Sequence, residues 1–224
     1  MNGAAGGVTL ADGEETVRLT TARLIEGAKV LRRRDPRLGA WIERVGKVSL
    51  RRQRSHFRAL CRSIVSQQLA STAAATIHAR FTALFEGGRP TPRDLLRQPT
   101  ARLRRCGLSK QKVRYLLALA EAFDGGDLAR IRLSKLDDQE VIDCLTQLPG
   151  IGVWTAEMFL IFSLGRLDVF SVGDLALRNA VQRVEGRELS QRQIVRVAER
   201  WSPFRSVACL YLWQIAHWSE EPSG

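Results

Sequence analysis

The 224-residue sequence has little of what marks a membrane, metal-binding or secreted protein. No apolar run approaches the roughly 18 residues that a membrane-spanning helix needs. The four cysteines lie far apart and the three histidines show no ligand spacing, which argues against a C-x-x-C metal site or an iron–sulfur cluster. We therefore expect a reduced cytoplasmic protein that requires no cofactor and has no membrane partner.

Strand patterns are equally scarce, because no segment alternates apolar and polar residues long enough to predict a sheet. Helix signals are dense instead. Asp35 and Thr91 each combine a helix cap with a following proline, and Ser109 opens a strongly amphipathic run. The nearly all-apolar residues 153–164 predict a buried central helix, and Pro203 is predicted to begin the last one. The sequence thus predicts an all-α fold of about ten short helices.

Positive charge dominates the composition, since Lys and Arg number 35 against 23 Asp and Glu, for a formal net charge of +12. A protein this basic favours polyanionic partners. On charge alone nucleic acid, an anionic membrane surface and ribosomal packing all remain open. Residues 1–16 differ, because they are rich in glycine and alanine and carry acids without a basic start or an apolar core. We expect a flexible tail there and no signal peptide.

One segment carries the strongest functional signal. Residues 148–156 read Leu-Pro-Gly-Ile-Gly-Val-Trp-Thr-Ala. Gly150 and Gly152 permit a tight hairpin. The helix that starts directly after it would present uncovered backbone amides at its positive end, where a phosphate can be held. Asp174 follows in a glycine turn and could reach the molecule to which that phosphate belongs. The two features together suggest chemistry on a nucleic acid.

These residues, with others, resemble a known family. The matching stretches are the hairpin at 148–156, the acidic turn at 168–174, and residues 63–69, 106–112, 201–206 and 211–213. They are similar to motifs of the helix-hairpin-helix DNA glycosylases, and within that superfamily to the 3-methyladenine DNA glycosylase II family. The resemblance implies an all-α fold of two helical subdomains, with the active-site cleft between them.

The expected division of the chain follows from that resemblance. Residues 55–165 are expected to form a central helical subdomain, with the helix-hairpin-helix motif at about 139–164. Residues 17–54 and 166–220 are expected to form the terminal subdomain together. Longer members of the family begin with a sheet domain, for which this sequence has no room.

The resemblance also implies the catalytic group. Cleavage of an N-glycosidic bond builds positive charge on the sugar, and a carboxylate near that charge stabilises it and can align a water. Asp174 is expected to play this part. It is equally suited to cap a helix that starts at Leu175, and both roles can coexist if one carboxylate oxygen stays free. Asp168 is the rival acid, with a structural role as its alternative.

Further site residues follow by match to the family motifs. Trp154, Met158 and Trp213 are expected to line the base pocket, where Trp154 could instead be a core aromatic. Gln68 or Leu69 is expected to fill the gap left by a flipped base, or else to be a helix end beside a core leucine. Phosphate contacts are expected from the backbone amides of Gly150, Gly152 and Trp154 and from Lys110 and Lys112. A structural Na⁺ or K⁺ could be held by the carbonyls of Thr146, Leu148 and Ile151.

Three substitutions within the matched motifs refine the expected activity. Trp154 stands where lyase-type members carry a lysine, so water is the expected nucleophile. Ser171 replaces a frequent proline before the catalytic turn, and Met158 replaces a frequent aromatic. We expect a monofunctional glycosylase that removes alkylated purines of the 3-methyladenine type from double-stranded DNA and leaves an abasic site. It is expected to act as a monomer in a bacterial cytoplasm, associated with the nucleoid through DNA.

Two other functions stay open. One is a helix-hairpin-helix module that binds DNA without catalysis, which would not need a carboxylate near phosphates. The other is a glycosylase for different damaged bases, including a lyase for oxidised bases with an iron–sulfur cluster. The scattered cysteines and Trp154 argue against the latter.

Overall fold

The computed structural model describes residues 18–50 and 52–218 of the chain. Helices and short connecting turns make up this part, and its only β pairing is an isolated antiparallel bridge between Arg18 and Arg166. The all-α prediction is confirmed. No helix among these residues is long and apolar enough to cross a membrane. The predicted tail at 1–16 lies outside the described residues.

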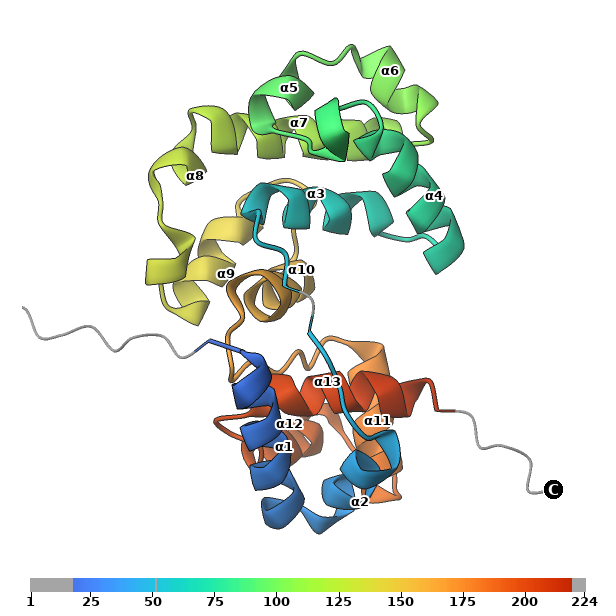
Figure 1. The fold of residues 1–224 in the computed structure, drawn as a ribbon, viewed down its shortest axis with the longest axis vertical. Helices are drawn as coiled ribbons and strands as arrows, with labels where there is room; N and C mark the ends of the chain where they lie inside the picture. The colour runs from blue at the N-terminus through green and yellow to red at the C-terminus, as the bar shows by residue number, and fades with distance from the viewer. Residues whose placement is uncertain (1–17, 51, 219–224) are drawn as a thin grey trace, which may run out of the picture.

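The helices form two lobes, one above the other in Figure 1. The lower lobe takes both ends of the described chain. The C-terminal helix α13 is buried along most of its length and packs against α1, α2 and α11. The helices of this lobe are α1 (Thr21–Arg34), α2 (Pro36–Val45), α11 (Leu175–Glu185), α12 (Gln191–Glu199) and α13 (Arg205–Ala216).

The upper lobe contains the segment between them. Helix α7 packs against α3 and α5, and α10 packs against α3 and α9, so the apolar faces meet in a shared core. The helices of this lobe are α3 (His56–Ser66), α4 (Ser71–Thr82), η1 (Glu86–Gly88), α5 (Pro92–Leu96), α6 (Thr100–Arg105), α7 (Lys110–Asp124), α8 (Asp127–Arg130), η2 (Leu133–Lys135), α9 (Asp138–Thr146), α10 (Val153–Phe159) and the π-helical turn η3 (Leu160–Leu164).

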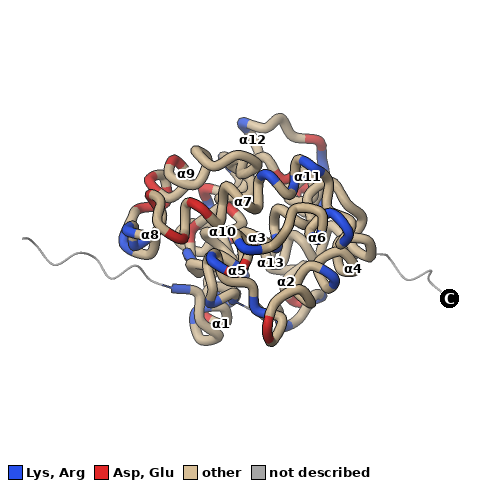
Figure 2. The backbone as a smooth tube through the Cα atoms, turned by 90° about the horizontal axis from the view of Figure 1, so that it is seen from above, with Lys and Arg blue, Asp and Glu red and all other residues tan. Residues whose placement is uncertain are grey.

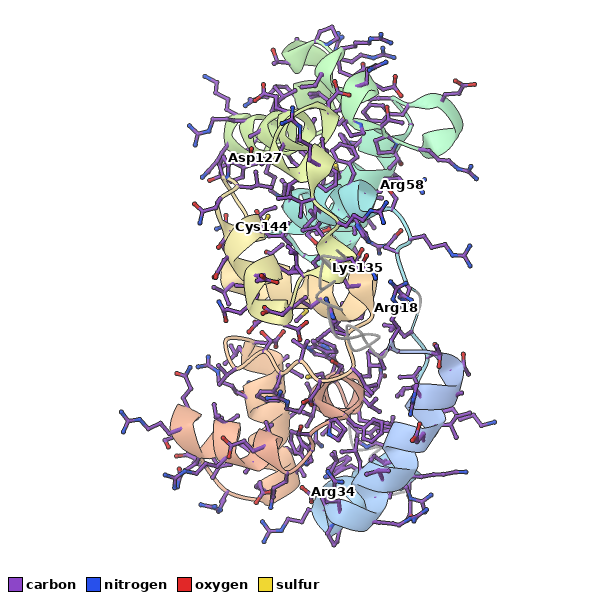
Figure 3. All side chains as sticks on the ribbon, turned by 90° about the vertical axis from the view of Figure 1, so that its left-hand side faces the viewer. Arg18, Arg34, Arg58, Asp127, Lys135 and Cys144 are labelled. Carbon is purple, nitrogen blue, oxygen red and sulfur yellow. The ribbon has the colours of Figure 1, made fainter. Side chains whose placement is uncertain are left out.

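The segments in which the chain passes from one lobe to the other are joined by hydrogen bonds. The guanidinium of Arg52 donates to the carbonyls of Ser163 and Leu164 at 3.0 and 2.9 Å. The amide of Leu19 donates to the carbonyl of Gly165 at 2.6 Å. Figure 3 shows Arg18 at this junction and Arg34 at the far end of the lower lobe. The subdomain boundaries that the sequence analysis placed at 54–55 and 165–166 stay a prediction.

Two sequence predictions needed correction. Residues 153–164 are not one buried α-helix, because Val153 and Trp154 are exposed and the last turn is a π-helix. The final helix begins at Arg205 and not at Pro203, since Phe204 precedes it with the non-helical ψ of 27°. The predicted N-caps at Asp35, Thr91 and Ser109 are confirmed, because each side chain accepts a hydrogen bond from an amide in the first helical turn.

Candidate active site and DNA interface

The hairpin joins α9 to α10. The amide of Ile151 donates to the carbonyl of Leu148 at 3.1 Å and closes the turn. Gly150 has a φ of +85°, and a Cβ there would lie 2.1 Å from Cδ2 of Tyr115, so both backbone and neighbour require glycine. Gly152 is the N-cap of α10 with an ordinary φ of −96°. A Cβ at Gly152 would meet nothing within 4 Å, so the protein itself does not demand glycine at this position.

The amides at the start of α10 are uncovered. Among the described residues no backbone carbonyl accepts from the amides of Gly150, Gly152 or Trp154. Gly152 provides no side-chain cap either. The arrangement suits an anion, because these amides lack carbonyl partners near the positive end of a helix. The phosphate contacts that the sequence predicts here stay a prediction.

The carbonyls proposed for a monovalent cation lie in the same turn. Leu148 accepts the Ile151 amide, whereas no backbone amide of the described chain donates to the carbonyl of Thr146 or Ile151. Carbonyl oxygens are hard donors that suit Na⁺ or K⁺. The donor set therefore fits the cation, which stays a prediction.

Asp174 lies opposite the start of α10. It is 8% exposed, and its Oδ1 accepts the Leu177 amide at 3.0 Å, so it caps α11. Its Oδ2 accepts the indole N–H of Trp154 at 2.9 Å and that of Trp213 at 3.4 Å. Neither oxygen is free, in contrast to the condition that the sequence analysis set for a dual role. Both indole N–H groups thus meet on the same oxygen of this carboxylate.

The predicted pocket residues fall on two helices, α10 and α13. Trp154 on α10 is 46% exposed, which excludes the alternative of a core aromatic. Trp213 on α13 is half-buried and lies against Phe162, with ring centroids 5.4 Å apart. Met158 is half-buried on α10, one helical turn after Trp154, and packs against the core. The structure thus brings both indoles to Asp174, and the predicted pocket role of Met158 stays untested.

A second carboxylate stands near Asp174. Glu157 on α10 accepts a hydrogen bond from the hydroxyl of Ser171, which is fully buried. Burial raises the pKa of Glu157, the bond from Ser171 opposes that rise, and the negative charge of Asp174 adds to it. Ser171 also accepts the Asp174 amide through its carbonyl at 3.1 Å. The residue that replaces the frequent proline therefore connects the two acids.

The rival acid, Asp168, is held in an ion pair. Its carboxylate accepts from Nε and Nη2 of Arg205 at 2.8 and 3.0 Å and from the Ser202 hydroxyl at 2.7 Å. Burial alone would raise its pKa, but the bonds from Arg205 and Ser202 outweigh burial, and the pKa is lowered. The carboxylate oxygens are saturated with donors, which supports the structural alternative for Asp168.

The predicted wedge residues lie at an exposed tip between α3 and α4. Gln68 has a φ of +55°, and Leu69 is 36% exposed, so Leu69 is not a core leucine. Lys110 at the start of α7 is exposed, as a phosphate contact would be. Lys112 differs, because its ammonium donates to the carbonyls of Val65 and Gln67 at 2.7 and 2.6 Å. The structure therefore gives Lys112 partners within the protein in place of the predicted phosphate.

Charge is unevenly distributed over this end of the molecule. Figure 2 shows acidic positions gathered around α9 and α10, whereas basic positions lie over α3, α5 and α6 and at the tip of α8. The basic side of this end suits a polyanionic partner.

Comparison with known proteins places the chain in a family. Residues 61–204 match the model of the HhH-GPD superfamily base excision DNA repair protein. The chain belongs to this superfamily. It is 37% identical over 159 residues to DNA-3-methyladenine glycosylase 1 of Schizosaccharomyces pombe, covering 69% of this chain and 70% of that protein.

Solved structures of superfamily members have the same fold. The DNA-3-methyladenine glycosidase of Bacillus halodurans superposes with a TM-score of 0.76 at 38% identity, covering 85% of this chain and 88% of the other. The 3-methyladenine DNA glycosylase Mag1 of Schizosaccharomyces pombe, solved in complex with abasic DNA, gives 0.73 at 33% identity, covering 84% and 95%.

Sequence reasoning missed three residues of this site. They are Glu157 beside Asp174, Phe162 against Trp213, and Gln67, whose side-chain amide donates to the Gly150 carbonyl at 2.7 Å. Glu157 could have been found, because it follows Trp154 by three residues on one helix and so lies beside it. The other two make contacts between segments far apart in the sequence, which no local pattern shows.

Proposed function

We propose that this superfamily member is a monofunctional DNA glycosylase that hydrolyses the N-glycosidic bond of alkylated purines in duplex DNA and leaves an abasic site. The observation that carries the proposal is the Asp174 carboxylate, held between two indole N–H groups opposite the hairpin helix. The names of its relatives, DNA-3-methyladenine glycosylases, support the substrate class.

The geometry supports a specific division of labour. The hairpin amides would hold the DNA backbone, while the target base leaves the stack and meets Trp154 and Trp213. Positively charged alkylpurines stack well on indole faces. Each such cation–π contact is worth about 0.5–2 kcal/mol once it is desolvated. As the base departs, positive charge grows on the sugar and Asp174 would stabilise it. An incoming water could then take the place of an indole donor on Oδ2 and be aligned for attack.

The decisive experiment replaces Asp174 with asparagine. Asparagine caps a helix as well as aspartate does, so the variant should fold. It removes the negative charge, which should lower single-turnover base release by on the order of a thousandfold, equivalent to several kcal/mol of transition-state stabilisation. Affinity for an abasic-site duplex should be retained or improved, because a negative group near phosphates is gone.

The matched control is Asp168→Asn. It removes an acid from the same segment, residues 168–174, but leaves in place the carboxylate that accepts from the two indoles. We expect it to keep base release while it weakens the fold. Near-wild-type turnover by Asp174→Asn would refute the assignment. Substrate class is read from duplexes that each contain 3-methyladenine, 7-methylguanine, ethenoadenine or 8-oxoguanine, and fastest release of 8-oxoguanine would contradict an alkylpurine enzyme.

A further inference from the structure

The end of α3 is held by a lysine from another helix. Lys112 lies in the first turn of α7, which packs along α3. Its ammonium donates to the carbonyls of Val65 and Gln67, at 2.7 and 2.6 Å. Two of its three donors are therefore engaged by the last turn of a helix, whose carbonyl end favours a cation. Burial lowers the pKa of Lys112, in keeping with its inward position.

Gln67 connects the same turn to the hairpin. Its backbone carbonyl accepts from Lys112, and its side-chain amide donates to the carbonyl of Gly150 at 2.7 Å. Gly150 is itself fixed, because Tyr115 fills the space where its Cβ would be. One continuous set of contacts thus runs from α7 through the end of α3 to the turn that would bind phosphate.

The residue after Gln67 has an unfavourable backbone conformation. Gln68 is the one residue other than glycine with positive φ among the residues that the structure describes. The left-handed region costs a residue with a side chain roughly 1–2 kcal/mol, so it persists only where the surroundings enforce it. Gln68 and Leu69 are exposed, and α4 begins after Ala70 without a side-chain cap. The support for this tip therefore comes from Lys112 and Gln67 on its N-terminal side.

We propose that Lys112 and Gln67 are positioning residues that hold Gln68 and Leu69 in the conformation that enters the duplex, and that they tie this tip to the phosphate-binding hairpin. The inference rests on the proposed function, because a tip that enters DNA has no use in a protein that opens no duplex. It assigns Lys112 a part distinct from that of a phosphate contact. The hairpin and the tip then act as one unit on DNA.

The neighbouring Lys110 provides a matched control. Lys112→Met and Lys110→Met remove the same charge from the same helical turn, but Lys110 is exposed whereas Lys112 is engaged by carbonyls. Entry of the tip is measured by the fluorescence of 2-aminopurine placed beside a tetrahydrofuran abasic site in a duplex. Affinity for undamaged duplex, its salt dependence and single-turnover release of 3-methyladenine are measured alongside.

We expect Lys112→Met to reduce the saturating fluorescence change and single-turnover release by tenfold or more. Its effect on affinity for undamaged duplex should be smaller than that of Lys110→Met. Lys110→Met should lower affinity and reduce the salt slope by about 0.9, with a full fluorescence change once the duplex is saturated. Equal effects of the two substitutions on affinity, slope and fluorescence would show that Lys112 is a phosphate contact and overturn the proposal.

Gln67→Ala tests the same inference without a change of charge, and it carries the test if Lys112→Met does not fold. It should also reduce the fluorescence change, and the double variant should lose less than the product of the two single losses, because both residues act on one tip. A full fluorescence change in Gln67→Ala would overturn the coupling. Because this readout needs no cleavage, it decides the matter even if wild-type protein releases none of the tested bases.

Discussion

Two carboxylates stand close together near the start of α11. Glu157 lies on α10 and accepts a hydrogen bond from Ser171, which is three residues before Asp174. Only Asp174 also receives the indole donors. The two acids therefore differ in their surroundings. The difference can be measured at Glu157, whose pKa is raised.

Glu157→Gln should stabilise the protein at neutral pH. A carboxyl whose pKa is raised by folding binds its proton more tightly in the folded state, so its stabilising contribution is present at low pH and is lost as pH rises through the folded pKa. Glutamine has no charge to bury and can still accept from Ser171. We expect a gain of at most about 1 kcal/mol at neutral pH, after solvent screening, that shrinks as pH falls toward the ordinary range of glutamate.

Urea unfolding of both proteins at several pH values measures this effect. Glu121→Gln, on the exposed side of α7, serves as the control. A stability difference between wild type and Glu157→Gln that is constant with pH would contradict the prediction.

Trp154 leads to a prediction about the product. A lyase step requires an amine that forms an imine with the sugar, and the start of α10 offers an indole instead. Borohydride added during turnover should therefore trap no covalent enzyme–DNA species, and the released product should be an intact abasic site. A glycosylase/lyase run in parallel shows that trapping works. A strong trapped band from this protein would reveal another amine as nucleophile.

The sequence pointed to residues that the structure brings together, but not to the contacts that support them. Asp174, Trp154 and Trp213 were singled out because each lies within a stretch that resembles a family motif, and both indoles donate to Asp174. The bond from Lys112 to Gln67 joins residues 45 positions apart, and the bond from Gln67 to Gly150 joins residues 83 apart. Such contacts depend on how α3, α7 and the hairpin pack, and packing is not encoded in any local pattern.

At the scale of elements, the two glycines of the hairpin differ in whether the folded structure requires glycine at their positions. Gly150 has a left-handed backbone and touches Tyr115, whereas Gly152 has an ordinary φ and open space around it. Gly150→Ala should therefore destabilise the fold by about 1–3 kcal/mol. Gly152→Ala should change stability by less than about 0.5 kcal/mol, because the poorer N-cap is offset by lower chain entropy in the unfolded state.

The two substitutions should have distinct effects on DNA binding. Alanine at Gly152 would place a methyl group where a phosphate approaches, so we expect weaker duplex binding from a protein of normal stability. Thermal unfolding and fluorescence anisotropy on one duplex measure both properties. Normal affinity in Gly152→Ala would mean that the phosphate does not approach the hairpin at this residue.

Helix starts were the elements that the sequence predicted best, because a cap is a local signal. The side chains of Asp35, Thr91, Ser109 and Asp174 each cap the helix that the sequence placed after them. The π-helical turn was missed, since four of its five residues are apolar, which is the composition of an ordinary buried helix. The burial of Val153 and Trp154 was overestimated for a related reason: exposure at the start of α10 is set by the hairpin and not by hydropathy.

For the whole molecule, the net charge of +12 predicts a steep salt dependence of DNA binding. Each phosphate neutralised adds roughly 0.9 to the slope of log affinity against log salt, and we expect several. Anisotropy titrations of an undamaged duplex across a range of salt concentrations give the slope. Arg33→Gln, on α1 away from the hairpin, should leave it unchanged. A slope near zero would mean that the basic surface faces something other than DNA.

The two-lobed arrangement also bears on how the chain forms during synthesis. Helices α1 and α2 pack against α13, which emerges from the ribosome after all the upper-lobe helices. At common rates of translation, roughly 10–35 s separate the end of α2 from the end of α13. During that time the apolar face of α1 and α2 lacks its final partner. A nascent chain is therefore expected to have its hairpin folded before the lobe that fixes Asp174 is complete.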